Sequence, residues 1–349
     1  MRILHVMAGA AEGGAENIML ESVLALQEDE GIEQFVVTRD NNAFRLKSFN
    51  AAGIGTATAS FDKLFKFKTR AAIKKAIAQF KPDVIEYWMG RAGQFALAEH
   101  RDISIGWYGG YYKLARFTQC KWHVGLSIDL CRHIREQGVE DKYVGLVHTM
   151  ADFEGADPTP RASLDTPEGA PLALALARLH VKKGLDTLLD ATAKTEGLYV
   201  WIAGDGPIED ALKAQCSALG LDNRVRFLGW RNDRGALLAA CDFVAFPSRY
   251  EPFGTVTVDS WAARRPIVAA DAVGPAAYVK DGINGLLIPK NDVDALASAM
   301  GRIMHEDGLA EKLVAGGDAT YAATFTKAAF TRDSLAFYEK IIAAKKDGG

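Results

Sequence analysis

"LALALARLHVKKGLDTLLDA", residues 172–191, contains a strand, a turn and a helix in immediate succession. Residues 172–177 are an unbroken apolar run, which is typical of a strand that is covered on both faces of a parallel sheet. Gly184 then precedes a stretch with helical periodicity. A strand that leads directly into a helix is the repeating unit of doubly wound α/β domains.

Apolar runs of the same kind recur along the whole chain, and helical stretches separate them. In the first half they are residues 2–7, 35–38, 83–88, 103–108, 123–127 and 143–148. In the second half they are residues 172–177, 199–204, 225–229, 243–248, 266–271 and 285–289. This alternation predicts two successive Rossmann-like α/β units, and it places ligands at the carboxyl ends of their strands.

A polar, proline-rich stretch interrupts the alternation between the two series. It spans residues 152–171 and has the composition of an interdomain connection. We therefore expect an N-terminal domain over residues 1–160 and a second domain over residues 161–325. The last segment, 326–346, reads as an amphipathic helix with no strand after it.

The composition is that of a globular protein of 349 residues, 49% hydrophobic and 24% charged. A net charge of −3 gives no general attraction to nucleic acid, so we expect no nucleic-acid partner. Four scattered cysteines indicate reduced thiols, and the chain starts directly on a strand pattern without a signal peptide. No apolar run approaches the length of a membrane span, and we expect a cytoplasmic protein.

Two cations flank the turn in the opening stretch, Arg178 at the end of the strand and Lys183 just before the helix. At the carboxyl end of a parallel strand they suit a diphosphate, which arginine binds through its fork geometry and lysine as a point charge. The alternative is an ordinary solvated basic turn. The position in the fold favours phosphate binding.

Two acids lie eight positions apart in "SRYEPFGTVTVD" (248–259), Glu251 in a loop and Asp259 in the helix after Gly254. Each carboxylate can accept two hydrogen bonds from the vicinal hydroxyls of a sugar or a ribose. The backbone of Phe253 and Gly254 would supply further contacts. The alternative is that both acids only stabilise the start of the helix, and the residues by themselves leave the two interpretations equal.

The first strand ends in "AGAAEGGAEN" (8–17), where Gly9, Gly13 and Gly14 precede a helix. Glycines there allow backbone amides to approach an anion, although a tight turn without a ligand explains them equally well. The order differs from the dinucleotide pattern G-x-G-x-x-G, which counts against NAD or FAD. The seven histidines form no metal-binding pattern, and we expect neither a metal nor a cofactor.

The segment 61–81 is strongly basic, with a net charge of +6 and phenylalanines interleaved among the cations. Its cations are Lys63, Lys66, Lys68, Arg70, Lys74, Lys75 and Lys81, and its one acid is Asp62. Such a segment fits the surface of an anionic membrane. A solvated helix that turns its apolar residues to the core is the alternative.

The segment "WYGGYYKLARF" (107–117) follows a predicted strand and is rich in aromatic residues. Aromatic faces and hydroxyls suit carbohydrate, so Tyr108, Tyr111 and Tyr112 are the residues expected to contact the acceptor. Packing in the core accounts for at least half of these aromatic residues as well.

Taken together, the motifs resemble those of the family 4 retaining glycosyltransferases of GT-B fold. In the second half the resemblance lies in "ARLHVKKG", "AGDGP", "VRFLGW", "PSRYEPFGTVTVD", "RPIVAAD" and "DGINGLLIP", which keep the family's order and spacing. The first half matches more weakly, through "GGAE", "KPDVIEYW" and "GYYKL". The resemblance implies two Rossmann-like domains that face a cleft, with the final helix packed on the first domain.

The resemblance also implies a reaction and a role for each site residue. It implies metal-independent transfer of a hexose from a UDP- or GDP-linked donor to a glycan or lipid-linked glycan, in the synthesis of an envelope polysaccharide or lipopolysaccharide. Arg178, Lys183 and Glu251 would be catalytic, with Arg178 and Lys183 on the diphosphate and Glu251 on the donor sugar. The remaining donor contacts would come from Gly13, Gly14, Phe253, Gly254, Thr255 and Asp259, the last of these on the ribose.

Three positions depart from the family pattern. Ala277 stands where the family has a glutamate, Arg264 where it has a helix-terminating glycine, and Gly109 where it often has a histidine. Arg264 suggests a different helix end, and the other two alter the surroundings of the donor sugar. Two alternatives therefore remain, a nucleotide-sugar epimerase or hydrolase of the same fold and a non-catalytic protein that binds sugar nucleotides.

Overall fold

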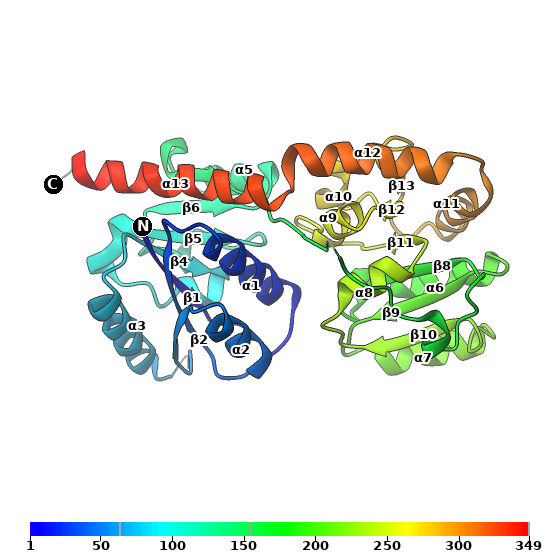
Figure 1. Cartoon of the computed structure of the whole chain (residues 1–349), viewed down its shortest axis with the longest axis horizontal. Coiled ribbons are helices and arrows are strands. Elements are labelled where there is room, and N and C mark those ends of the chain that lie inside the picture. The colour runs from blue at the N-terminus through cyan, green and yellow to red at the C-terminus, as the bar shows by residue number, and fades with distance from the viewer. Residues whose placement is uncertain (63, 154, 348–349) are drawn as a thin grey trace. The chain divides into compact units, whose positions relative to one another are not determined.

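The computed structural model describes residues 1–349 apart from 63, 154 and 348–349. The chain divides into two compact units, one made of Met1–Met150 and the residues from Lys327 on, the other of Ala151–Thr326. Each unit contains a parallel β-sheet that helices cover (Figure 1). The predicted class, two doubly wound α/β domains, is confirmed.

The sheet of the first unit has the strand order β3-β2-β1-β4-β5-β6-β7. Its strands are β1 Arg2–Met7, β2 Glu33–Thr38, β3 Gly55–Thr58, β4 Val84–Trp88, β5 Ser104–Tyr108, β6 Trp122–Gly125 and β7 Val144–Leu146. Its helices are α1 Gly14–Gln27, α2 Ala43–Ala51, α3 Lys66–Phe80, α4 Met89–Gly93, α5 Ile128–Glu136 and α13 Lys327–Asp347, with short 3-10 turns η1 Ala98–Ile103, η2 Leu114–Arg116 and η3 Asp141–Tyr143.

The sheet of the second unit has the strand order β10-β9-β8-β11-β12-β13. Its strands are β8 Leu172–Leu176, β9 Tyr199–Ala203, β10 Val225–Gly229, β11 Phe243–Phe246, β12 Ile267–Ala270 and β13 Leu286–Ile288. Its helices are α6 Leu185–Lys194, α7 Glu209–Ala218, α8 Arg234–Ala240, α9 Thr255–Ala262, α10 Val273–Tyr278, α11 Val293–His305 and α12 Leu309–Thr324, with 3-10 turns η4 Arg161–Leu164 and η5 Val181–Lys183.

One strand, β3, is absent from the sequence prediction. Its sequence, GTAT, contains no apolar run, and every residue in it is at least partly exposed. It pairs only with β2 at the edge of the sheet, where one flank of the strand needs no apolar cover. Its formation depends on hydrogen bonds to β2 and not on a local pattern.

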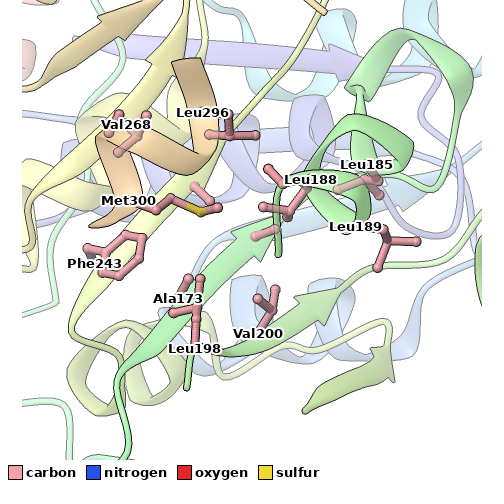
Figure 2. Close-up of a cluster of buried hydrophobic side chains, with 14 of the residues drawn as sticks. Ala173, Leu185, Leu188, Leu189, Leu198, Val200, Phe243, Val268, Leu296 and Met300 are labelled. Carbon is pink, nitrogen blue, oxygen red and sulfur yellow. The ribbon is translucent and has the colours of Figure 1, made fainter. Parts of the chain in front are cut away.

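The core of the second unit explains why residues 172–191 are rich in leucine. Leucines of α6 pack against α11 above the buried residues of β8 and β9, as Figure 2 shows. Leu185, Leu188 and Leu189 are fully buried there. At roughly 25 cal/mol per Å² of apolar surface, each buried leucine contributes about 1.5–3 kcal/mol to this contact.

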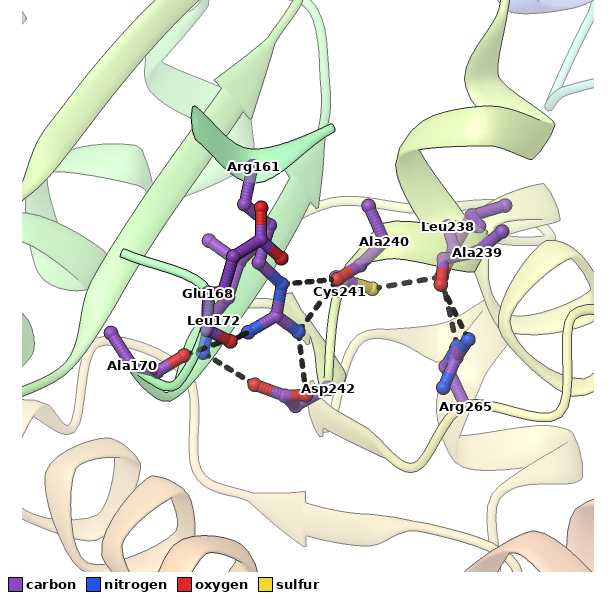
Figure 3. A network of polar contacts seen from close by, with 10 residues as sticks. All are labelled: Arg161, Glu168, Ala170, Leu172, Leu238, Ala239, Ala240, Cys241, Asp242 and Arg265. Carbon is purple, nitrogen blue, oxygen red and sulfur yellow. Dashed lines mark hydrogen bonds and ion pairs between the residues drawn. The ribbon is translucent and has the colours of Figure 1, made fainter. Parts of the chain in front are cut away.

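The proline-rich stretch belongs to the second unit, because Arg161 holds it there. The Arg161 guanidinium donates to the carbonyls of Ala240, Glu168 and Ala170 at 2.7–3.2 Å, and to the Asp242 carboxylate at 2.7 Å (Figure 3). The chain accordingly changes unit between Met150 and Ala151, earlier than the expected boundary at residue 160.

Helix α9 ends at Ala262, two residues before Arg264, which departs from the family pattern. The φ of Arg264 is 55°, the left-handed conformation that favours glycine, so the expected change of helix end is wrong. The Arg264 amide donates to the Trp261 carbonyl at 2.9 Å, and the guanidinium pairs with Asp318 at 3.0 Å. These contacts offset the cost of a left-handed arginine.

A buried carboxylate connects the C-terminal helix to the first sheet. Glu86 of β4 is fully buried, and its Oε1 accepts hydrogen bonds from Trp107 Nε1 and Tyr338 Oη, both at 2.7 Å. Its Oε2 lies 2.9 Å from Nδ1 of His5 in β1. Strands β1, β4 and β5 and helix α13 therefore meet at one charged group, and α13 packs on this unit.

We predict that Tyr338→Phe lowers the free energy of unfolding by about 1–3 kcal/mol, because Glu86 then loses a buried donor. Denaturant unfolding measures the difference. The matched control is Tyr108→Phe, since the Tyr108 hydroxyl is buried with no hydrogen-bond partner among the described residues. A loss of equal size in both variants would show that the Glu86 contact contributes nothing specific.

Candidate donor-binding site

The loops that carry the predicted donor residues meet at the carboxyl edge of the second sheet. Strands β8, β9 and β11 are parallel neighbours, so their following loops emerge at the same edge. The Leu179 amide donates to the Asp205 carbonyl at 2.7 Å, and the Arg249 amide donates to the Lys182 carbonyl at 2.8 Å. Three loops are thus joined by their backbones.

Lys183 and Glu251 are brought into direct contact. The Lys183 ammonium forms an ion pair with Oε1 of Glu251, and the two side chains keep 25% and 11% of their surface exposed. Arg178, by contrast, is exposed and forms no side-chain hydrogen bond or ion pair within the described part of the chain. The site therefore holds one compensated cation and one available cation.

Arg249, which the sequence analysis missed, fixes the loop that carries Glu251. Its guanidinium makes a bidentate contact with the Asp186 carboxylate at 2.7 and 2.8 Å and donates to the Val181 carbonyl at 2.6 Å. Burial alone would raise the pKa of Asp186, but the Arg249 hydrogen bonds and charge hold it below its ordinary value. The signal in the sequence was a cation two positions before Glu251.

Gly184 allows α6 to approach the end of β11. Its φ is 66°, and a Cβ at this position would lie 2.2 Å from the Pro247 carbonyl oxygen. Any other residue would push η5 and Lys183 away from the loop after β11. The glycine thus sets the spacing between the two halves of the ion pair.

Asp259 lies in α9 and is 5% exposed. Arg234, at the start of α8, places Nη2 3.3 Å from its Oδ1, and the Arg234 guanidinium stacks 5.1 Å from the centre of the Phe153 ring. The carboxylate is therefore held in one orientation by a partner that the sequence analysis did not single out. The only hint was a cation after the strand 225–229.

The loop before α9 is rigidly packed. Phe253 is buried, with its ring centre 5.5 Å from that of Tyr278, and Gly254 is the left-handed N-cap of α9. Thr255, the first residue of the helix, is half-buried. These residues lie between Glu251 and Asp259 in one continuous turn, although Glu251 and Asp259 have different ionic partners.

In the first unit, the glycine turn after β1 closes around a carboxylate of its own chain. Oε1 of Glu16 accepts the Ala10 amide at 2.7 Å. A Cβ on Gly13 would lie 2.3 Å from the Glu16 carboxylate, whereas Gly14 has open space around it. Glu16 was missed because one acid in a first helical turn is common.

The three tyrosines expected at the acceptor wall have different surroundings. Tyr108 is fully buried in the core of the first unit, its ring 4.5 Å from that of Phe117 between centres, so it packs the core and does not form an acceptor wall. Tyr111 donates a hydrogen bond to Asp129, and Tyr112 contacts Sδ of Met89 at 3.6 Å. Both are half-buried.

Met89 occupies the space beside the missing histidine. A Cβ on Gly109 would lie 2.5 Å from the Met89 sulfur. Met89 itself has a φ of 66°, which is rare for a bulky residue, at the carboxyl end of β4. The Met89 side chain therefore fills the space into which a side chain at position 109 would extend.

The described residues contain neither a metal-binding cluster nor a membrane-spanning helix. Within the described ranges, no three His, Cys, Asp or Glu side chains gather as a metal site requires. No described helix is both long enough and apolar enough to span a bilayer.

A hollow of about 770 Å³ lies near Arg161 at the amino edge of the second sheet, away from the loops that carry the predicted donor residues. The hydrogen-bond donors of Arg161 are already bonded.

Comparison with known proteins defines the class first. Anabaena Alr3699/HepE, solved in complex with UDP-glucose, superposes with a TM-score of 0.82 over 100% of both chains at 20% identity, which shows the GT-B fold. The model of the family "Glycosyl transferases group 1" matches residues 157–319.

Two lipopolysaccharide core biosynthesis glycosyltransferases of Rhizobium meliloti (strain 1021) are similar over their whole length. LpsD is 31% identical, covering 99% of this chain and 100% of LpsD, and LpsE is 30% identical, covering 95% and 97%. The chain belongs to the group 1 glycosyltransferases, the family 4 type of GT-B fold.

The Asp186–Arg249 contact makes a prediction about pH. A depressed folded-state pKa gives stability that is complete above the unfolded value, about 3.9, and is lost as the pH falls through the folded value. The difference in unfolding free energy between wild type and Asp186→Asn should therefore be constant above about pH 5 and shrink below about pH 4. Denaturant titrations at each pH measure it, with the exposed Asp205→Asn as control. A difference that persists at low pH would contradict the assignment.

Gly109→His should lower the free energy of unfolding by about 1–3 kcal/mol, because the new side chain overlaps Met89. The double variant Gly109→His/Met89→Gly should recover part of the loss, since glycine adopts the φ of residue 89 without strain. Denaturant unfolding of both variants is the measurement. Wild-type stability in the single variant would show that Met89 moves aside freely.

Proposed function

We propose that the chain is a retaining glycosyltransferase that moves a hexose from a nucleotide diphosphate sugar to a glycan or lipid-linked glycan acceptor in lipopolysaccharide core synthesis. The observation that carries the proposal is the juxtaposed Lys183 and Glu251 at the carboxyl edge of the second sheet. The role of LpsD and LpsE in lipopolysaccharide core biosynthesis supports the pathway, and the UDP-glucose complex of HepE supports the donor class.

The charges of this edge suit the departure of a diphosphate. Arg178 is exposed and uncompensated by a described side chain, and Lys183 keeps a quarter of its side chain open. Preorganised cations stabilise the negative charge that develops on the leaving group. We assign Arg178 and Lys183 to this role.

The acids of the edge suit hydroxyl groups. Glu251 would bind hydroxyls of the transferred sugar, with the backbone of Phe253 and Gly254 beside it, and Thr255 would lie against the phosphates. Asp259 is buried on α9 and paired with Arg234, and we assign its carboxylate to the ribose hydroxyls. No residue is assigned as a nucleophile on the sugar. In the proposed front-face reaction, the leaving phosphate accepts the proton of the acceptor hydroxyl.

Further features support the finer parts of the proposal. The proposed transfer needs no metal ion. Tyr111 and Tyr112 remain candidates for the acceptor wall, because both are half-buried after β5. Membership of the family favours transfer over the epimerase, hydrolase and binding-only alternatives.

Calorimetric titration with UDP, GDP and their sugars tests the donor assignment. One base should bind, and Lys183→Ala should weaken its binding by about 10- to 100-fold, the range for a hydrogen bond to a charged group. The matched control is Lys182→Ala, the neighbouring lysine, whose ammonium lies over the Tyr250 ring at 4.6 Å. Equal losses in both variants, or no binding of any nucleotide, would contradict the proposal.

A second measurement tests the stereochemistry. NMR of the product formed with the lipopolysaccharide acceptor should show the anomeric configuration of the donor. Inversion would rule out the front-face reaction and leave the donor assignment intact.

A further inference from the structure

An exposed apolar segment comprises the two residues before α3 and the first turn of that helix. Leu64, Phe65 and Phe67 are 86%, 49% and 65% exposed, respectively. The later turns of α3 face the core instead, because Ile73, Ala76 and Ile77 are buried there. Of the two interpretations of the basic segment, packing of its apolar residues on the core therefore holds for the later turns of α3. It does not hold for the start of the helix, where the apolar side chains are exposed. We call residues 64–70 the apolar tip.

Specific contacts hold the base of the apolar tip in place. Phe61 is fully buried, with its ring centre 5.3 Å from that of Phe95, and its amide donates to Oγ1 of Thr69 at 3.1 Å. The Leu64 amide donates to Oδ1 of Asp62 at 2.8 Å. Phe61 and Thr69, on either side of the exposed side chains, are therefore held in the first unit by specific contacts.

Cations surround the exposed apolar side chains. Lys66, Lys68 and Arg70 are all exposed, and the Lys68 ammonium lies 5.2 Å from the centre of the Phe65 ring. Lys63, which belongs to the same basic segment, lies outside the described residues.

Two more arginines lie beside the base of the apolar tip. Arg39 Nε donates to the Ser60 carbonyl at 3.0 Å, and burial together with the charge of Arg91 lowers the pKa of Arg39. Arg91 thus acts on Arg39 as a second positive charge, and Asp62 and Asp40 act on it as acids. The combination of apolar surface and uncompensated positive charge is complementary to an anionic bilayer surface.

The apolar tip lies at the edge of the first sheet that also carries the glycine turn. Ser60 follows β3, and Arg39 and Asn41 follow β2. The Asn41 amide nitrogen donates to the Gly9 carbonyl, after β1, at 3.2 Å. Because the strands are parallel, all these loops emerge at their carboxyl ends. A membrane that contacts the apolar tip therefore borders the face where this unit would receive an acceptor.

We propose that the apolar tip docks on an anionic lipid bilayer, inserting Leu64, Phe65 and Phe67 at the interface while Lys66, Lys68 and Arg70 contact the headgroups. The attachment is peripheral, since no described helix can span a bilayer. It needs no donor or acceptor, so it stands or fails separately from the proposed activity.

Flotation with vesicles tests the docking. Wild type should bind vesicles of phosphatidylcholine with 30 mol% phosphatidylglycerol and not those of phosphatidylcholine alone. Lys66→Glu/Lys68→Glu should weaken binding by about tenfold or more, and so should Phe65→Ser/Phe67→Ser. The controls are Lys213→Glu/Lys312→Glu, with the same change of charge on exposed residues of the second unit, and Ile283→Ser, which removes an apolar side chain that is 54% exposed.

A fluorescent label tests insertion itself. All four cysteines are buried, and burial raises the pKa of each thiol, so an introduced surface cysteine reacts preferentially. An environment-sensitive dye on Phe67→Cys should shift its emission to the blue with anionic vesicles, and the same dye on Lys75→Cys should not. Equal flotation of all variants, as expected if the apolar tip binds a protein, or no shift at residue 67, would overturn the proposal.

Discussion

The carboxylate of Glu86 is the constraint on which the first unit depends. A charge that is fully removed from water must be compensated by hydrogen bonds and by a counter-charge. Here Trp107 and Tyr338 donate hydrogen bonds to one oxygen of Glu86, and Nδ1 of His5 lies 2.9 Å from the other oxygen. The last helix must therefore pack on the first sheet, although the whole second unit separates them in the sequence. The final helix is consequently part of the first core.

The second unit uses its charges differently, because they lie at a partly open edge. Arg249 and Asp186 fix the distance between two loops, and Gly184 permits the close approach that this distance requires. Lys183 and Glu251 then face each other with part of their surface open to solvent. The loops that Arg249 and Gly184 hold together thus also carry the residues that we propose to bind the donor.

Much of the fold follows from local pattern. The central strand β1, buried in all but its first residue, has the same bounds as the run at 2–7, and the partly buried edge strand β10 has the same bounds as the run at 225–229. The edge strand β3 contains no apolar run, so the sequence pattern did not reveal it. The left-handed Arg264 shows that a missing glycine does not change a helix end when other contacts stabilise it. Tyr108 shows that an aromatic run cannot be divided into core and surface by its sequence.

The sequence by itself determined the fold class, the order of the strands along the chain, and which residue types lie at the carboxyl ends of the strands. These properties depend on periodicity and on motifs that are continuous in the chain. Only the tertiary structure decided which charges pair. Arg249 with Asp186, Arg234 with Asp259 and Glu86 with Tyr338 are contacts between segments that are distant in the sequence, so no local pattern reveals them. For Asp259 and Glu86, burial also leaves the carboxylate few partners within reach.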